Sequence, residues 1–353
     1  MTEKEAYIAF NMIDHIGSVR LATLSETFGG VVNAWYGYPD KVARSGGEVD
    51  YVAELKRAEK YGVTILTPAD DAYPKRLKDL SSHPLALYVK GDVSALSHCS
   101  LAMVGTRRAS QYGLTTARSL ASELVGAGWA IVSGLALGVD AESHRGALEA
   151  NGITVGVLGS ALDRFYPEEN RDLARDIVKS GGAVVSQFPF GRYPDKETFP
   201  IRNEIIAALS EGTIAVECPI KSGTMITCNF AAEIGRTVMA FPGRATDKLS
   251  RGCNKLIREG ATLVTGLDDV MEAMSELLPR KTITEDSSKE KIELPPYSLE
   301  ESLIMRCLDD SGVSMEKLVD RSGLSAAKVN SLAIELRMKG RVKFLPGNRI
   351  ASI

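Results

Sequence analysis

The sequence has few cysteines and no long apolar run, and each absence excludes a class of protein. Five cysteines are scattered over 353 residues, and none forms a C-x-x-C pair. A zinc ribbon or a disulfide framework is therefore not expected, and the cysteine usage favours a reducing, cytoplasmic location. No stretch approaches the roughly 18 consecutive apolar residues of a spanning helix, so we expect no membrane partner. The N-terminus, MTEKEAYIAF, also lacks the apolar segment of a secretory leader.

An excess of charge of one sign is lacking as well. Lysine and arginine together number 42, aspartate and glutamate 45, and the formal net charge is -3. A nucleic-acid site must therefore rest on local rather than overall charge. Hydrophobic residues make up 44% and charged residues 25% of the chain, the balance of a soluble globular protein. At roughly 100 to 200 residues per domain, the length predicts two or three domains.

The middle of the chain alternates short apolar runs with longer amphipathic segments. Strands rich in Val, Ile, Ala and Leu, each followed by a helix, predict a parallel sheet covered on both faces. Right-handed crossovers make this an α/β fold with an extended Rossmann-like, doubly wound parallel sheet. The expected strands are 100–105, 130–134, 153–159, 183–188, 213–218, 237–241 and 262–266, and the expected helices lie near 113–127, 139–150, 168–180, 203–211, 223–235 and 253–259.

Two smaller domains are expected to flank this sheet. Short helices around a turn at 15–18 indicate a small helical domain of the SAM or helix-hairpin-helix kind. Near the C-terminus, three short helices and a basic hairpin across Pro346-Gly347 indicate a winged-helix-like domain. A polar stretch without periodicity, ending in proline, indicates a linker before it. The predicted boundaries are 1–65 for the helical domain, 66–278 for the Rossmann-like domain, 279–297 for the linker and 298–353 for the winged-helix-like domain.

Ligands of an open parallel sheet bind outside the carboxyl ends of its strands. After the first predicted strand, Gly105, Thr106 and Arg107 precede a helix. A tight turn, a hydroxyl, a guanidinium and the free N–H groups of a helix together suit an anion. The turn matches neither G-x-G-x-x-G nor the P-loop, so dinucleotide binding and P-loop hydrolysis lack their motifs.

The second predicted strand ends in Ser133 and Gly134, and Asp140 and His144 follow in the next helix. We interpret Asp140 as a helix cap and His144 as a packed histidine, because no Ser or Cys stands in a G-x-S-x-G elbow to act as a nucleophile. His, Cys and carboxylate residues form no cluster at metal-ligand spacing. The sequence therefore predicts no catalytic site, no metal and no cofactor.

Later segments add donors to the same sheet edge. Loop 191–203 interleaves basic and aromatic residues just before a helix, which suits single-stranded nucleic acid, although a solvated loop with its Phe buried in the core is an equal alternative. A helix opened by Ser and Thr follows strand 213–218, and a third Gly-rich turn spans 242–254. The candidate binding residues here are Lys196, Phe199, Arg202 and Asn203 in the loop, and Ser222, Gly223 and Thr224 at the helix start.

The C-terminal tail is basic, which suits contact with a duplex backbone. The predicted recognition helix, however, offers few side chains that read bases, so a partner-binding or regulatory role is favoured over sequence-specific reading. The base-reading candidates are Lys328 and Asn330, and the tail carries Arg337, Lys339, Arg341, Lys343 and Arg349.

With these motifs in place, residues 65–270 resemble the DNA-processing protein A family (DprA, also called Smf). The matching pieces include HPLALYVKG, MVGTR, SGLALGVDAESHRGAL, TVGVLGSALDRFYPEEN, FPIRNEIIAALSEGTIAVE, SGTMIT and RGCNKLIREGA. The resemblance implies a binding protein rather than an enzyme. Such proteins coat incoming single-stranded DNA in natural transformation, dimerise through the Rossmann-like domain and help to load the RecA recombinase.

The resemblance also assigns residues. It places the phosphate-binding turn on Gly105, Thr106 and Arg107, the basic pocket on Lys196, and the F-P-x-R-N segment on 199–203. Two positions depart from the family pattern. Glu204 stands where the family has a second Arg, and Gln187 stands where it often has Glu. A carboxylate at position 204 could pair with Arg202 and repel a phosphate, which predicts a changed affinity at an unchanged site.

Two alternatives from other classes stay open. Several donor-rich turns around one crevice also suit an enzyme or a sensor for a small nucleotide, although no paired acid and base accompany them. A transcriptional regulator would instead read duplex DNA with its wing and use the Rossmann-like domain as a ligand sensor.

Overall fold

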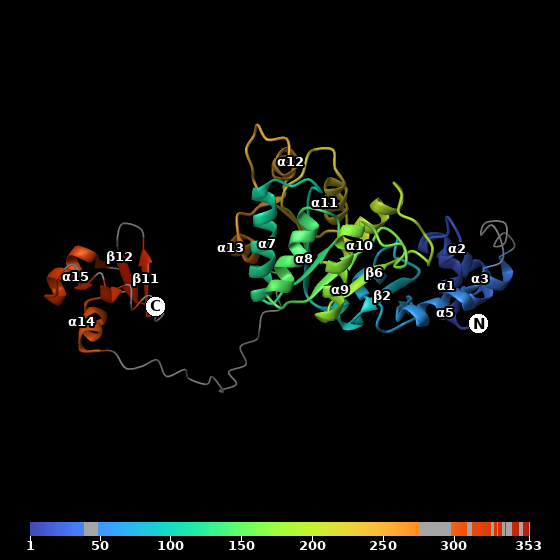
Figure 1. Cartoon of the computed structure of the whole chain (residues 1–353), viewed down its shortest axis with the longest axis horizontal. Helices are drawn as coiled ribbons and strands as arrows, with labels where there is room; N and C mark the ends of the chain where they lie inside the picture. Colours follow the sequence, from blue (N-terminus) through green and yellow to red (C-terminus); the bar gives the residue numbers. More distant parts are fainter. Residues whose placement is uncertain are drawn as a thin grey trace. The chain divides into compact units, whose positions relative to one another are not determined.

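The computed structural model divides the chain into two compact units, Met1–Arg280 and Lys281–Ile353. Each unit is described by itself (Figure 1). No helix in the described part of the chain has the length and apolar composition needed to cross a membrane. The structure describes residues 1–38, 49–275, 298–308, 313–325, 328–329, 331–333, 336, 341–345 and 349–352.

A nine-stranded sheet forms the centre of the first unit, in the order β1-β2-β6-β5-β4-β3-β7-β8-β9. All the strands expected from the sequence are present, and they pair in parallel, which confirms the α/β fold class. The sequence analysis missed β1 and β2, which pair antiparallel at one edge and have no crossover helix between them to mark them. The bounds are β1 Thr64–Leu66, β2 Leu87–Gly91, β3 Ser100–Val104, β4 Ala130–Ser133, β5 Thr154–Val157, β6 Ala183–Ser186, β7 Gly212–Ala215, β8 Thr237–Ala240 and β9 Thr262–Leu263.

The strand order reverses beside β3. From β3 the chain adds β4, β5 and β6 on one side and then returns to place β7 on the other. The loops that follow β3 and β7 therefore leave the sheet in diverging directions. This topological switch point opens a crevice at the carboxyl ends of the strands.

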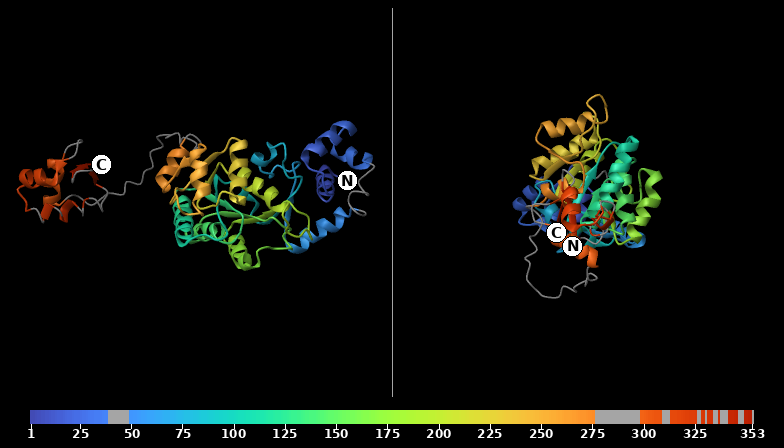
Figure 2. Two further views of the ribbon diagram at one scale, coloured as in Figure 1. Left: turned by 90° about the horizontal axis from the view of Figure 1, so that it is seen from above. Right: turned by 90° about the vertical axis from the view of Figure 1, so that its left-hand side faces the viewer.

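Helices cover both faces of the sheet (Figure 2). Side chains alternate along each strand, so Leu101 and Met103 of β3 pack with α7 while Ala102 and Val104 pack with α10 and α11. The helices on the α7 side are α7 Gln111–Gly126, α8 Val139–Glu149, the short η2 Glu168–Asn170, α9 Arg171–Lys179 and α13 Leu267–Ala273. Those on the other side are α10 Thr198–Leu209, α11 Gly223–Glu233 and α12 Arg251–Arg258, with the short α6 Lys75–Lys78 and η1 Val93–Ser97.

Helix α10 begins earlier than the sequence analysis predicted. Asp195 Oδ1 accepts hydrogen bonds from the backbone N–H groups of Glu197 (2.8 Å) and Thr198 (2.9 Å), which starts the helix at Thr198. Pro200 is tolerated in the first turn, where its missing N–H has no intrahelical partner in any case. The F-P-x-R-N segment is therefore helical, and the prediction that it lies in a loop is wrong.

The N-terminal helices surround a small aromatic core. The Phe10 and Trp35 rings pack edge to face with centroids 5.2 Å apart. The predicted pair of helices around a turn at 15–18 is present, and the described residues 31–38 and 49–63 add α3 and α5 after it. These helices belong to the same compact unit as the sheet, so the boundary at 65 stays a prediction. The bounds are α1 Glu3–Asn11, α2 Ser18–Phe28, α3 Val31–Gly37 and α5 Tyr51–Tyr61.

The second unit is a winged helix. Its three strands pair antiparallel in the order β10-β12-β11, and Ile304, Leu318, Val329 and Ile350 form part of its core. Residues 328–329, 331–333 and 336 are helical. The bounds are α14 Leu299–Cys307, β10 Val313–Ser314, α15 Met315–Ser322, β11 Val342–Leu345 and β12 Arg349–Ser352.

A buried glutamate joins helix α5 to the sheet. The Oε1 atom of Glu54 accepts hydrogen bonds from the Tyr88 hydroxyl (2.9 Å) and from the Phe190 backbone N–H (2.8 Å). Burial raises the pKa of the Glu54 carboxyl, and these two hydrogen bonds only partly oppose the increase. A carboxyl with a raised pKa in the folded state stabilises the fold most below its ordinary pKa of 4.5, and this contribution is lost as the pH rises through the folded-state pKa.

Replacing Glu54 with Gln should therefore give a pH-dependent gain in stability. The amide oxygen can keep both hydrogen bonds, and no charge is buried as the pH rises. In urea unfolding, we expect the free energy of unfolding of Glu54→Gln relative to wild type to increase between pH 4.5 and pH 8. Glu59→Gln, on the exposed face of the same helix, is the control and should show no such trend. An equal loss of stability at both pH values in Glu54→Gln would contradict this account.

Candidate functional site

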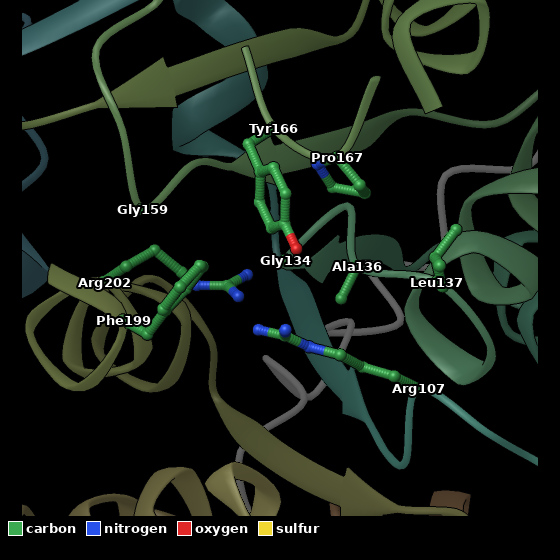
Figure 3. A pocket seen from close by; sticks show the side chains of 9 residues that line it. All are labelled: Arg107, Gly134, Ala136, Leu137, Gly159, Tyr166, Pro167, Phe199 and Arg202. Atoms are coloured by element: carbon green, nitrogen blue, oxygen red, sulfur yellow. The ribbon is translucent and has the colours of Figure 1, made fainter. Parts of the chain in front are cut away.

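A cavity of about 480 Å³ lies at the switch point, beyond the carboxyl ends of β3 and β7. A smaller pocket of about 30 Å³ adjoins it, and the two share Arg107, Ala136, Phe199 and Arg202 (Figure 3). Most of the candidate residues from the sequence analysis meet here. The large cavity is lined by Gly105, Thr106, Arg107, Phe199, Arg202, Asn203, Ser222, Gly223 and Thr224, and Gly134 lines the small pocket.

Two guanidinium groups converge at the junction of these spaces. Arg107 comes from the turn after β3 and Arg202 from the second turn of α10, and Figure 3 shows their ends pointing toward one another. The Phe199 ring lies beside both, with its centroid 4.8 Å from Arg107 Cζ and 6.0 Å from Arg202 Cζ. Phe199 thus lines the cavity, and the alternative of a core plug does not hold.

Arg202 is a buried cation with incomplete neutralisation. Only 5% of it is exposed, and its Nη1 donates to the Val157 carbonyl at 3.2 Å. The carboxylate paired with it belongs to Asp140, whose Oδ2 lies 3.9 Å from Arg202 Nη1. The buried Nε of Arg202 has no hydrogen-bond partner within the described residues. Burial lowers the pKa of Arg202 to about 10, Asp140 opposes this, and Arg107 adds to it. At neutral pH the group is charged, and an anion between the two guanidiniums would relieve their repulsion.

Asp140 and Gly134 hold Arg202 in place. The N-cap of α8 is Gly138, so the prediction that Asp140 caps this helix is wrong. Its Oδ2 instead accepts from the Gly134 N–H at 3.2 Å while it faces Arg202. A Cβ atom at Gly134 would overlap the Arg202 guanidinium, so only glycine fits there. The next residue, Leu135, has φ 54°, an uncommon conformation that turns the chain away from β4.

Helix α7 does not offer its N-terminus to a ligand. Its N-cap is Ser110, whose backbone N–H and hydroxyl both donate to the buried carboxylate of Glu217 at 2.8 Å. An internal carboxylate therefore occupies the position that the sequence analysis assigned to an anion. That part of the prediction is wrong, whereas the turn itself still brings Thr106 and Arg107 to the cavity.

Helix α11 supplies the helix N-terminus instead. Ser222 caps it by accepting from the Met225 N–H at 3.4 Å, and Gly223 and Thr224 in its first turn line the cavity. The first N–H groups of a helix have no partner within it, so this end favours an anion. Asn203 Nδ2 donates to the Gly223 carbonyl at 3.2 Å, which fixes α10 against α11.

Two candidates do not line the cavity. Ser133 is buried, and its hydroxyl donates to the Met103 carbonyl at 2.6 Å, so its role is to join β4 to β3. Lys196 is exposed in the segment before α10 and makes no ion pair within the described residues. The third Gly-rich turn is closed on itself, because Gly243 and Asn254 exchange hydrogen bonds of 3.1 and 2.9 Å.

Three further expectations concern single side chains. His144 is buried with Nδ1 2.7 Å from Thr154 Oγ1, and burial lowers its pKa to about 3, as befits the packed histidine predicted. Glu204 does not pair with Arg202, since its carboxylate accepts from the Ser82 hydroxyl at 3.4 Å. In the winged helix, Lys328 pairs with Glu300 at 2.9 Å. Asn330, Arg337 and Lys339 lie outside the described residues, as do the side chain of Lys343 and the turn at Pro346-Gly347.

The loops at the carboxyl edge of the sheet, around and beyond the cavity, carry exposed cations, and we call this edge the rim. Within the described residues they form no ion pairs, whereas arginines on the helical faces do, such as Arg118 with Glu142 and Arg171 with Glu168. A chain with a net charge of -3 therefore presents unbalanced positive charge at this edge. Besides Arg107 and Lys196, the exposed cations are Arg108, Lys221, Arg244, Lys248 and Arg251.

The fold and this cavity define the chain as a doubly wound α/β protein whose switch point brings together two guanidinium groups and the N-terminus of a helix. Comparison with known families is specific. The family model "DNA recombination-mediator protein A" matches residues 64–275, and the "DprA winged helix domain" matches residues 289–348. The chain therefore belongs to the DprA (Smf) family of DNA-processing proteins.

Individual relatives agree with this assignment. The chain is 42% identical to the DNA processing protein DprA of Streptococcus pneumoniae over 57% of its own length and 71% of the relative's. It is 34% identical to protein Smf of Escherichia coli over 81% and 76%. The X-ray structure of the Streptococcus pneumoniae protein aligns with a TM-score of 0.64 at 33% identity, covering 77% of this chain and 98% of that one. The Helicobacter pylori protein, whose structure was described for its single-stranded DNA binding mode, aligns with a TM-score of 0.54 at 30% identity, over 61% and 96%.

The contact between Gly134 and Arg202 can be tested by stability. Gly134→Ala should lower the free energy of unfolding in urea by about 1–3 kcal/mol, because the added methyl group displaces a buried guanidinium. Gly126→Ala is the matched control. A Cβ atom at Gly126, the last residue of α7, meets no other atom within 4 Å, so this change should leave stability unchanged or raise it by up to ~1 kcal/mol. Equal effects of the two substitutions would refute the contact.

Proposed function

We propose that this protein binds single-stranded DNA in the switch-point cavity without cutting it. The observation that carries the proposal is the convergence of Arg107 and the buried, incompletely neutralised Arg202 on one point. A phosphodiester there would accept hydrogen bonds from both guanidiniums, and charge-assisted bonds of this kind are among the strongest available. The single-stranded DNA binding described for the Helicobacter pylori relative supports the choice of ligand.

The chemistry of the cavity favours backbone contacts over base reading. The first turn of α11 and the Thr106 hydroxyl would add donors to phosphate oxygens, and the exposed cations of the rim would attract neighbouring phosphates. The Phe199 ring offers a surface on which an unpaired base can stack. Because such contacts are available to any base, binding should show little sequence preference.

The cellular role proposed is that of a recombination mediator in the cytoplasm. It would protect incoming single-stranded DNA in natural transformation and help to load RecA onto it. Membership of the DprA family supports this role and a homodimer formed through the Rossmann-like domain. A protein that delivers DNA to a recombinase has to hold the strand without chemistry, in line with a binding protein rather than an enzyme.

Removing Arg107 should weaken binding and reduce its dependence on salt. In a fluorescence-anisotropy titration with oligo-dT, we expect Arg107→Ala to raise Kd about 3- to 10-fold. The slope of log K against log salt should fall by roughly 0.7, the value for one fewer phosphate contact on a single strand. Arg107 is exposed, so the substitution should not affect folding.

The matched control is Arg258→Ala. Arg258 is also exposed, but it ends α12 and so lies toward the opposite edge of the sheet from the cavity. The Arg258→Ala variant should bind oligo-dT with the affinity and the salt slope of the wild type. The proposed site is ruled out if the affinity of the wild type for oligo-dT does not depend on salt. It is also ruled out if Arg107→Ala binds with the same affinity and salt slope as Arg258→Ala.

A second candidate function is that of a sensor or enzyme for a small nucleotide. The smaller pocket of about 30 Å³ favours it, because Arg107, Arg202 and Tyr166 line a space suited to one compact anionic group. Nucleoside monophosphates at millimolar concentration would then raise the melting temperature by several degrees through preferential binding to the folded state. We expect no such increase and no product, whereas oligo-dT should raise the melting temperature.

A further inference from the structure

An exposed aromatic side chain lies beside the cavity and takes no part in the core. Tyr193 is 62% exposed in the segment between β6 and α10. The Arg164 guanidinium covers part of its ring, with Cζ 4.6 Å from the ring centroid. Stacking of the cation favours this orientation of the ring, while most of the residue remains in contact with solvent.

The two loops that carry this pair are tied to one another. The Ala161 N–H donates to the Arg192 carbonyl at 3.0 Å, and the Gly191 N–H donates to Asp163 Oδ1 at 2.9 Å. Both bonds lie within three residues of the stacked pair in each loop. Tyr193 therefore lies in a loop that two hydrogen bonds join to the neighbouring loop 161–164.

The pair lies close to the proposed phosphate site. Arg164 precedes by two residues Tyr166, which lines the small pocket and has its ring centroid 6.1 Å from that of Phe199. Two residues of extended chain span about 7 Å at most. The exposed, unpaired Lys196 stands midway in sequence between Tyr193 and Phe199. Ring, cation and ring thus follow one another in the sequence, in the segment that leads from β6 into α10.

This arrangement has the components that single-stranded nucleic-acid sites use. Successive bases stack on exposed aromatic rings while cations contact the backbone between them. A packing role does not explain Tyr193, because so little of it is buried. The Tyr193 hydroxyl can also donate to a phosphate oxygen, so a variant that keeps the ring and lacks the hydroxyl separates stacking from a phosphate contact.

We propose that the Tyr193 ring, backed by Arg164, is a stacking platform for an unpaired nucleobase. This rests on the proposed function, since the base belongs to a strand whose phosphate lies between Arg107 and Arg202. Lys196 contacts a phosphate between the cavity and the platform. The strand then leaves the cavity across the loops after β5 and β6.

The test compares Tyr193→Ala and Tyr193→Phe on two ligands, oligo-dT and an abasic oligonucleotide of the same length. On oligo-dT, Tyr193→Ala should raise Kd roughly 5- to 100-fold, the range for loss of one stacked base, while Tyr193→Phe stays within about twofold of wild type. The salt slope should not change, because a base contact releases no counterions. On the abasic strand, Tyr193→Ala and wild type should bind equally.

The control is Tyr36→Ala, since Tyr36 is 66% exposed in α3 and far from the cavity in sequence. It should bind both strands like wild type. If Tyr193→Ala also binds oligo-dT like wild type while Arg107→Ala remains impaired, the platform is wrong and the proposed function stands. An equal loss on the abasic strand, or a loss only in binding of RecA, likewise overturns the platform. Failure of the wild type to bind oligo-dT overturns the proposed function itself.

Discussion

The structure at the switch point depends on keeping Arg202 charged inside the protein. A buried guanidinium needs hydrogen-bond acceptors and opposite charge, and Arg202 has one carbonyl at 3.2 Å and one carboxylate at 3.9 Å. The surroundings adapt to that need. Gly134 has no side chain because the guanidinium occupies its space, and Asp140 faces inward instead of capping α8. These groups leave the charge of Arg202 incompletely neutralised, so its guanidinium can still bind an anion.

The same constraint explains how a slightly acidic chain can present a basic site. On the helical faces, arginines are engaged by neighbouring carboxylates, as Arg118 is by Glu149 and Arg145 is by Glu142. Around the switch point the two buried acids are bonded inside the protein. Glu217 accepts from Ser110, and Asp140 accepts from the Gly134 N–H and pairs with the buried Arg202 rather than with an exposed cation. Local charge therefore comes from how acids are bonded rather than from how many there are.

The sequence predicts the features that local patterns encode and misses those set by distant contacts. Apolar runs locate the parallel strands, and the rule for carboxyl ends correctly brings Arg107 and Ser222 to one edge of the sheet. The bond between Ser110 and Glu217 joins residues 107 apart, so no local pattern could show that α7 is already occupied. The same holds for the burial of Arg202 and for the hydroxyl of Ser133, which serves a neighbouring strand. A lone motif identifies residues, whereas their partners decide which of them a ligand can reach.

The site combines two kinds of cation that respond differently to solvent. Arg202 is buried and fixed, so in the proposed complex its interaction with a phosphate would be weakly screened by salt and would set the position of the strand. Arg108, Lys221 and Lys196 are exposed, and their attraction to neighbouring phosphates is screened within about 8 Å at physiological ionic strength. For the mediator proposed, this division has a consequence. One fixed contact would set the position of the DNA strand in the cavity. Many weak contacts would give an affinity that a growing RecA filament can overcome one phosphate at a time.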